Sequence, residues 1–329
     1  RKCSMADFWF QFLLALDSTL RVATPLIFAA MAGIFSERSG IIDISLEGKM
    51  LMAAFVAAAV AYGTGSPWIG ALAAIIVSVL AGLLHGFACI IHRGNQVISG
   101  LAINILASGL TVIIGIALFR QGGQTPTLPK SARFNSIELP FAQYVADNIP
   151  ILGVVYKELI SGHNILVWLA LASVGITYYI LFKTTFGLRL RAVGEKPEAL
   201  DSAGISVSKM RFQAIIIAGI LCGLAGVYLS TATGAGFVKE MTAGKGYIAL
   251  AAMIFGKWRP VPALYACLMF GFLEAVAARV QGAEFPIIGE ISSDLLLALP
   301  YVLTVVLLAG FIGGVSPPRA IGQPYIKER

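Results

Sequence analysis

The sequence has 329 residues, of which 58% are hydrophobic and only 12% are charged, and its mean hydropathy is +0.84. A soluble domain carries about 25% charged residues, so these values exclude a water-soluble globular protein. The formal net charge is +7. Because the basic residues lie between apolar runs, they favour cationic loops on the cytoplasmic side of a membrane over a nucleic-acid interface.

Long apolar runs predict membrane-spanning helices. Such runs approach the ~20 residues that cross ~30 Å of hydrocarbon as a helix, and the alternation typical of barrel strands does not occur. We therefore expect a single all-α domain over residues 1–329, a polytopic transmembrane bundle of about nine or ten spans with broken or re-entrant helices. The apolar segments are 8–35, 50–62, 68–91, 97–119, 164–182, 212–231, 246–256, 261–279 and 291–313.

Three of these segments depart from a plain span. Segment 8–35 is interrupted by two charged residues and by Pro25, so its first part is predicted to be an interfacial helix that leads into a short span. Segments 50–62 and 246–256 are too short to cross alone unless flanking residues join them. Short or broken apolar pieces are typical of transporter binding sites.

The loops predict the orientation of the chain. Residues 183–211 hold six basic and three acidic residues, so this loop is expected to be cytoplasmic. The long loop 120–163 lies one span away and is therefore expected to be extracytoplasmic. Counting onward places His92 and Lys257 inside, whereas the parity of the N-terminus depends on the form of residues 36–49.

Small residues and cysteines both favour a packed bundle. Glycines recur at four-residue spacing, a pattern that lets helix backbones approach closely in lipid: Gly82 with Gly86, and Gly219 with Gly223. The cysteines lack the spacing of a disulfide framework or a zinc site, so no metal is expected. They are Cys3, Cys89, Cys222 and Cys267.

Charged residues gather in segment 36–49, between two apolar pieces. Ionisable groups near the membrane pair with one another or face a water-filled path, and Gly40 and Gly48 allow the backbone to unwind. The freed backbone groups would then contact a polar solute or brace the bundle. An ordinary loop with internal ion pairs remains the alternative. The charged residues at issue are Glu37, Arg38, Asp43 and Glu47.

Two polar residues share a face of the otherwise apolar segment 97–119. Asn104 and Ser108 are four residues apart, which places them on one side of a helix. An amide at this position can bond a sugar hydroxyl or the edge of a base. It can equally bond a neighbouring helix, a contact worth ~1 kcal/mol.

The basic loop contains a predicted short helix. Pro197 fits the first turn, acidic residues favour the positive end of the helix dipole, and Gly204 can close the helix. A short helix on the cytoplasmic face would suit the docking of a soluble partner, and a plain connector is the alternative. The acidic residues are Glu195, Glu198 and Asp201.

The remaining polar motifs do not indicate an enzyme. The stretch 234–246 fails the phosphate-loop pattern, because Gly246 stands where Ser or Thr is needed and Lys239 where Gly is needed. Glu274 and Arg279 favour a structural ion pair or interface anchor over a proton relay, and His85 favours a hydrogen-bonded core position. No metalloprotease motif or nucleophile elbow occurs in the sequence.

Four blocks in order resemble the ABC-importer permeases for simple sugars and nucleosides, over most of residues 20–315. The ending Leu46-Glu47-Gly48 is similar to the nucleoside branch, whereas Asp43 is more typical of the ribose branch. The resemblance therefore favours nucleosides and leaves a ribose-like sugar or riboflavin as alternative solutes. The blocks are TPLIFAAMAGIFSERSGIIDISLEGKMLMAAF, NQVISGLAINILASGLT, GLRLRAVGEKPEALDSAGISV and GKGYIALAAMIFGKWRPVPALYACLMFG.

This resemblance implies a division of labour among several chains. It implies two permeases, with a heterodimer favoured, a cytoplasmic ABC ATPase that holds ATP and magnesium, and an extracytoplasmic substrate-binding protein, all at a bacterial inner membrane. This chain would bind no cofactor itself. The implied ATPase-coupling residues are Glu195, Lys196, Pro197, Glu198, Ala199, Asp201 and Gly204. The residues expected to line or brace the substrate pathway are Asp43, Ser45, Glu47, Asn104 and Ser108.

An ion-coupled secondary transporter is the alternative from another class. Such a protein would need an ion-coupling site inside the membrane, for which Asp43, Glu47 and Glu274 are the candidates. Uptake that depends on the proton gradient and survives loss of ATP would favour this alternative.

Overall fold

A computed structural model describes residues 5–138, 156, 161–280, 284–285, 289–290, 298, 302, 306 and 317–327. Most of the span expected over 291–313 and most of residues 139–160 of the long loop lie outside the described residues. Within this described part, seven helices are long and apolar enough to cross a membrane. The chain is a polytopic helical bundle, as its composition predicts.

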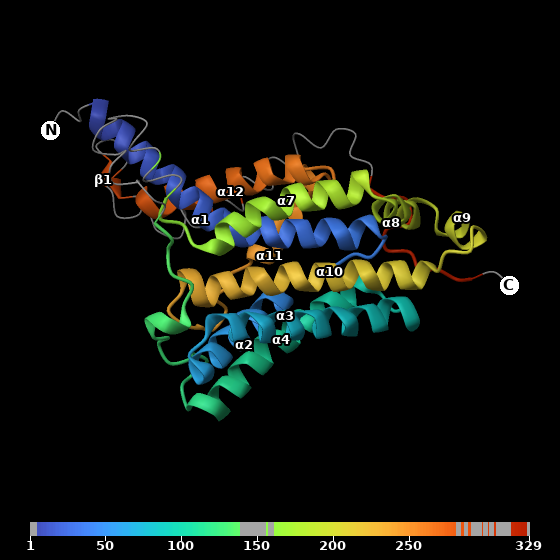
Figure 1. Ribbon diagram of the computed structural model, residues 1–329, viewed down its shortest axis with the longest axis horizontal. Coiled ribbons are helices and arrows are strands. Elements are labelled where there is room, and N and C mark those ends of the chain that lie inside the picture. Colours follow the sequence, from blue (N-terminus) through green and yellow to red (C-terminus); the bar gives the residue numbers. More distant parts are fainter. Residues whose placement is uncertain are drawn as a thin grey trace.

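The helices follow one another along the chain, and the longest connection between two of them, residues 120–164, joins α4 to α7 (Figure 1). Two helices continue as π-helical turns, α3 through Phe87–Ile91 and α10 through Tyr228–Thr233, and a two-residue strand pair joins Glu284–Phe285 (β1) to Gly289–Glu290 (β2). The helices are α1 (Met5–Arg38), α2 (Leu46–Thr64), α3 (Pro67–Gly86), α4 (Gln96–Phe119), α7 (Ile165–Lys183), α8 (Thr185–Glu195), α9 (Pro197–Ser202), α10 (Val207–Val227), α11 (Lys245–Phe255) and α12 (Pro260–Val280).

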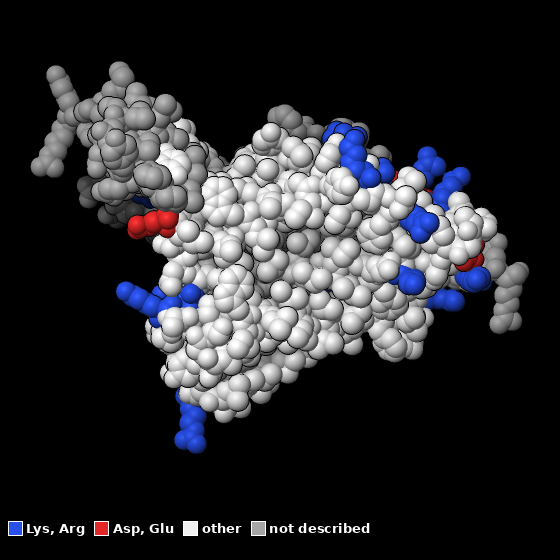
Figure 2. All heavy atoms as spheres, viewed as in Figure 1, with Lys and Arg blue, Asp and Glu red and all other residues white. Residues whose placement is uncertain are grey.

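The long helices lie side by side and define two ends of the molecule. The α9 end holds α8, α9 and residues 317–327, and the far end holds the α2–α3 turn and residues 120–138 (Figure 1). Lysine and arginine side chains gather at the α9 end (Figure 2). The connection 183–211, expected as a loop, is largely helical, because α8 and α9 occupy most of it.

Helix α1 differs from its prediction, since Met5–Arg38 is one continuous helix rather than an interfacial helix followed by a short span. Asp17 and Arg21 pair with each other one turn apart, at 3.1 Å. Pro25 lacks a backbone N–H and therefore leaves the carbonyl of Arg21 without its helical donor. The hydroxyl of Tyr228 donates to this carbonyl at 2.9 Å. A hydroxyl from α10's continuation thus keeps α1 intact across its proline.

Helices α1, α2 and α10 are the most buried spans of the described part, and α3 packs against α2 and α10. A Cβ on Gly219 or on Gly223 would lie 2.8 Å from the Cα of Val79 or Ile75 on α3, so the two backbones meet where the glycine spacing predicts. Cys89 and Cys222 are free, buried side chains of this packing, as expected. Helix α4 lies on the outside of the bundle and exposes most of its apolar side chains.

Candidate functional site

The segment between α1 and α2 is a buried turn whose backbone groups are bonded inside the protein. Gly40 adopts a positive φ of 88°. The side-chain oxygen of Gln96 accepts from the Ile42 N–H at 2.7 Å, and the Ile42 carbonyl lies 3.0 Å from Nε2 of His85. His85 also contacts Ser99 at 3.0 Å, which confirms its predicted hydrogen-bonded core position.

Asp43, Ser45 and Lys49 form a buried charged cluster at the start of α2. The Lys49 ammonium lies 2.6 Å from Oδ2 of Asp43, and the Ser45 hydroxyl donates to Oδ1 at 2.5 Å. Both charged side chains are fully buried. A buried charge needs such a partner, because desolvation otherwise costs several kcal/mol, about 3–5. Two predicted pathway residues, Asp43 and Ser45, are therefore placed where they hold the turn against α2.

The carboxylate of Glu47 joins α2 to the short helix α11. Its two oxygens accept from the backbone N–H groups of Gly244 at 2.8 Å and Gly246 at 2.6 Å, at the N-terminus of α11. These N–H groups have no partner within the helix, and the helix dipole favours a negative charge there. A Cβ on Gly246 would lie 2.6 Å from the Glu47 nitrogen, so glycine permits this approach.

Asn104 of α4 forms hydrogen bonds both to the start of α2 and to α11. Its Oδ1 accepts from the Gly48 N–H at 2.8 Å, and its Nδ2 donates to the Ile44 carbonyl at 3.0 Å and the Tyr247 hydroxyl at 2.8 Å. The Gly48 position approaches the Asn104 backbone so closely that a Cβ would lie 2.8 Å from its Cα. The amide therefore braces α2 and α11 and leaves the Tyr247 ring partly exposed, at 43%.

Ser108, one turn further along α4, donates a hydrogen bond to the carboxylate of Glu240. Glu240 is exposed and adopts a positive φ of 56° in the connection before α11. We name Asn104, Ser108, Glu240 and Tyr247 the polar face. Sequence reasoning identified its two α4 members and missed Tyr247 as a site residue, because no local pattern links α4 to a residue 143 positions away.

The predicted coupling residues lie together at the α9 end. Helix α9 begins at Pro197, and Gly204 follows it with a positive φ of 78°, as the sequence predicts. Pro197 and Leu200 are buried and attach the helix to the bundle. The side chains that remain exposed belong to Glu195, Lys196, Glu198 and Ala199, with Gly204, while Asp201 is half-buried beside Lys327 at 3.6 Å.

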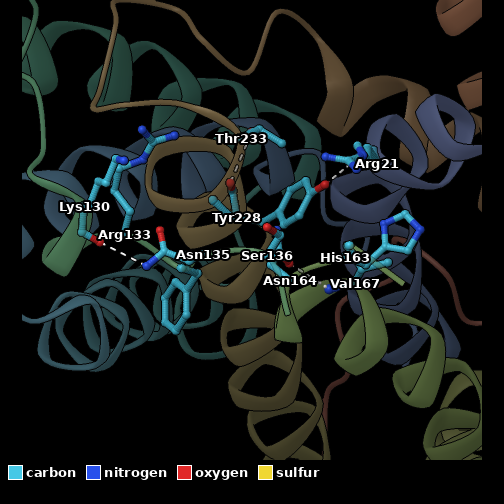
Figure 3. Close-up of a pocket in the computed structure, with 13 residues that line it drawn as sticks. Arg21, Lys130, Arg133, Asn135, Ser136, His163, Asn164, Val167, Tyr228 and Thr233 are labelled. Atoms are coloured by element: carbon cyan, nitrogen blue, oxygen red, sulfur yellow. Dashed lines mark hydrogen bonds between the residues drawn. The ribbon is translucent and has the colours of Figure 1, made fainter. Parts of the chain in front are cut away.

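A basic pocket of about 580 Å³ lies toward the far end (Figure 3). Arg21 enters it from α1, and Lys130 and Arg133 enter it from the loop after α4. The side chain of Asn135 turns back to donate to the Lys130 carbonyl at 3.2 Å. His163 lies on the other wall of the pocket, with its Nε2 atom 3.5 Å from Asp17. The pocket combines three basic side chains with amide groups, and one of the three, Arg21, is paired with Asp17 at 3.1 Å.

Glu274 forms a different ion pair from the one that its sequence neighbourhood suggests. It contacts the Lys245 ammonium at 2.5 Å and so joins α12 to the first residue of α11. Arg279 instead donates to the Leu14 carbonyl and to the Ser18 hydroxyl, the latter at 3.0 Å, and ties α12 to α1. The structural role predicted for both residues holds, but each uses a partner on another helix.

The chain matches a known transport family over most of its length. The family of branched-chain amino acid transport system permease components matches residues 15–308. Among curated relatives, the guanosine ABC transporter permease protein NupQ of Bacillus subtilis is 40% identical over 95% of this chain and 96% of its own length. The nucleoside ABC transporter permease protein NupC of Lactococcus lactis is 37% identical over 93% of this chain and 95% of its own length.

A second permease of Bacillus subtilis is also similar to this chain but more distantly. The guanosine ABC transporter permease protein NupP is 29% identical over 88% of this chain and 79% of its own length. Two different proteins that share the description of a guanosine ABC transporter permease in one organism therefore differ clearly in their similarity to this chain.

Proposed function

Because the chain belongs to the family of branched-chain amino acid transport system permease components, we propose that it is a membrane subunit of an ABC importer for nucleosides. The observation that carries the proposal is its near-full-length similarity to a guanosine and a nucleoside ABC transporter permease. The chain would form the solute path and leave ATP and magnesium to a partner ATPase. The lack of a complete phosphate-loop pattern in the sequence agrees with that division.

The distribution of charge supports an orientation in a bacterial inner membrane. Basic side chains gather at the α9 end (Figure 2), and the positive-inside rule assigns such an end to the cytoplasm. The far end, with residues 120–138, then faces outward. Because α1 is one continuous helix that reaches the α9 end at Arg38, its first described residue lies on the outer side.

The coupling role belongs to α9 in this proposal. A six-residue helix anchored by Pro197 and Leu200 presents Glu198 and Ala199 to the cytoplasm, where an ATPase would contact them. Movement of the ATPase would reach the membrane helices through α8, which packs against α1, α7 and α10. A flexible loop would absorb such a movement, whereas a short helix anchored by two buried side chains can transmit it.

The polar face is the proposed solute contact. Polar side chains on the outside of membrane helices are costly against lipid, so they favour a water-filled path or a neighbouring subunit. The Tyr247 ring can stack on a base, and the Glu240 carboxylate can accept from base N–H groups or ribose hydroxyls. Tyr247→Leu and Glu240→Gln should lower nucleoside uptake while assembly is retained.

Two unlike permeases are expected to enclose the path. Two Bacillus subtilis proteins described as guanosine ABC transporter permeases resemble this chain to very different degrees, which favours a heterodimer over two identical copies. The basic pocket at the far end would then receive acidic side chains of an extracytoplasmic binding protein. Arg133→Glu should weaken that contact without changing ATPase binding, since residues 120–138, which include Arg133, lie at the opposite end from α9 (Figure 1).

Gentle purification from the native membrane tests the proposal. The tagged chain should bring down an ABC ATPase and a second permease, and uptake of radiolabelled guanosine should require ATP and compete with other nucleosides better than with ribose. Ala199→Arg on α9 should remove the ATPase but leave the second permease bound. Recovery of the folded chain alone, with uptake driven by the proton gradient, would favour the ion-coupled alternative.

A further inference from the structure

Residues 317–327, here called the strap, lie across the α9 end of the bundle (Figure 1). The Ala320 N–H donates to the Gly194 carbonyl of α8 at 2.8 Å, and the Gly322 N–H donates to the Gly40 carbonyl of the buried turn at 3.0 Å. These two backbone bonds attach one short segment to both the helix before α9 and the turn before α2. The strap is therefore part of the folded bundle.

Arg211 of α10 holds the strap by a hydrogen bond from inside the bundle. Its side chain is buried, with 1% exposure, although it carries a charge. Its Nε donates to the Ser39 carbonyl of the turn at 3.2 Å, and its Nη1 donates to the Gln323 carbonyl of the strap at 3.3 Å. Hydrogen bonds from a charged donor are stronger than those from a neutral one. Arg211 thus positions the strap relative to the turn that holds the buried Asp43.

The outer part of the strap shares a surface with α9. A hollow of about 420 Å³ is lined by four α9 residues and by Tyr325 and Ile326 of the strap. The Lys327 ammonium lies 3.6 Å from the carboxylate of Asp201, one of the residues that line this hollow. Ile326 is 58% exposed at an end of the molecule that is rich in charge. The α9 residues that line the hollow are Glu198, Ala199, Asp201 and Ser202.

We propose that the strap residues Tyr325–Lys327 and α9 form one composite docking surface for the ATPase subunit. The inference rests on the proposed function and extends its contact from one helix to two segments. Its occupant is the ATPase because the hollow continues the exposed face of α9, so a protein seated on Ala199 also covers Ile326. The fitting partner surface has an apolar group for Ile326 and a basic group beside Glu198.

Through the composite surface, a movement of the ATPase would reach the membrane helices by a second path. A displacement of α9 passes through α8, whereas a displacement of the strap passes through Gly322 and Arg211 to the turn before α2. That turn contains Asp43, which pairs with Lys49 of α2, and it precedes Glu47, the residue that caps α11. The strap therefore connects the docking surface directly to the segments behind the polar face.

Binding of the co-purified ATPase to the permease complex in lipid nanodiscs tests this inference. Ile326→Asp and Lys327→Glu change exposed strap residues, Ala199→Arg changes α9, and Lys183→Glu changes an exposed lysine of α7 as the matched control. We expect each strap variant to weaken ATPase affinity at least about tenfold, the ratio for one lost contact of ordinary size, and the control to match the wild type.

The variants separate failure of this inference from failure of the proposed function. Wild-type affinity in both strap variants, together with loss of binding in Ala199→Arg, would overturn the composite surface and leave the α9 proposal standing. Wild-type affinity in all three would overturn both. Thermal midpoints of the variants serve as the folding check, and since Ile326 and Lys327 are exposed we expect them to be unchanged.

Discussion

Helices α2 and α4 are both membrane spans, yet they relate to the bundle in opposite ways. Helix α2 is the less apolar of the two and is mostly buried inside the protein, whereas α4 is more apolar and mostly exposed. In water the more apolar helix would be the more buried one. In a bilayer, lipid tails are as apolar as leucine, and it is the polar groups that need protein partners.

The comparison explains why charge gathers around α2. Glu47 and Lys49 lie in its first turn, and each is bonded to another segment rather than to lipid or water. The exposed side chains of α4 are mostly isoleucine and leucine. Its polar residues face α11: Asn104 bonds Tyr247 of that helix, and Ser108 bonds Glu240 in the connection before it. Buried polar contacts therefore fix the interior helices, and apolar surface marks the outer one.

The largest expected effect comes from breaking the buried pair at the start of α2. Asp43→Asn leaves the Lys49 ammonium buried without a counter-charge, and we expect a loss of about 3–5 kcal/mol of stability. The thermal midpoint of the purified chain in detergent measures the effect. The double variant Asp43→Asn with Lys49→Met should recover much of the loss, because no uncompensated charge remains.

The exposed pair Asp17–Arg21 provides the control for that prediction. Arg21 is about half exposed, so Arg21→Gln should change stability by ~1 kcal/mol at most. Equal losses in Asp43→Asn and Arg21→Gln would show that burial does not distinguish the two pairs.

A smaller loss of stability is expected where α3 packs closely against α10. Gly219→Val places a side chain where even Cβ would lie 2.8 Å from the Val79 backbone, so the helices must separate. Overpacking of this kind costs about 1–3 kcal/mol. Gly175→Val is the matched control, since that glycine of α7 has open space around it. The two variants should differ clearly in thermal midpoint, and similar midpoints would contradict the close crossing.

A smaller effect is expected at the cap of α11. Glu47→Gln keeps an oxygen for one backbone N–H but presents an amide donor to the other, either Gly244 or Gly246. Loss of a capping acceptor costs about 0.5–2 kcal/mol. Glu195→Gln, at an exposed glutamate, should have no measurable effect in the same melting experiment. Protection of the α11 amides from hydrogen exchange should fall in Glu47→Gln alone.

Local sequence patterns predicted the elements better than the contacts between them. The spans α3, α4 and α7, the short α11 and the start of α9 at Pro197 follow from apolar run lengths and capping residues. The first part of segment 8–35 was predicted to be an interfacial helix that leads into a short span, whereas Met5–Arg38 is one continuous helix. The hydroxyl that satisfies the freed carbonyl belongs to Tyr228, 207 residues from Arg21, and no local pattern contains it.

In the candidate site, too, the residues could be singled out from the sequence but their partners could not. Asp43, Glu47 and Asn104 stood out because polar residues are rare in apolar runs, and their residue types indicated either a solute path or a brace. Their actual partners depend on chain segments as far as 199 residues away, as for Glu47 and Gly246. The sequence therefore singled out side chains that make polar contacts between segments, and the packing of distant helices decided which partner each one contacts.

The smallest expected effect lies on the outer surface of α4. Ile113 is 65% exposed, so Ile113→Ala mainly replaces side-chain contact with lipid by lipid itself. Because this exchange is nearly neutral in a bilayer, we expect stability to change by less than ~0.5 kcal/mol. Ile103→Ala, on the buried side of the same helix, should cost about 2–5 kcal/mol. If Ile113→Ala instead lowers retention of the second permease at an unchanged thermal midpoint, this surface of α4 contacts that subunit rather than lipid.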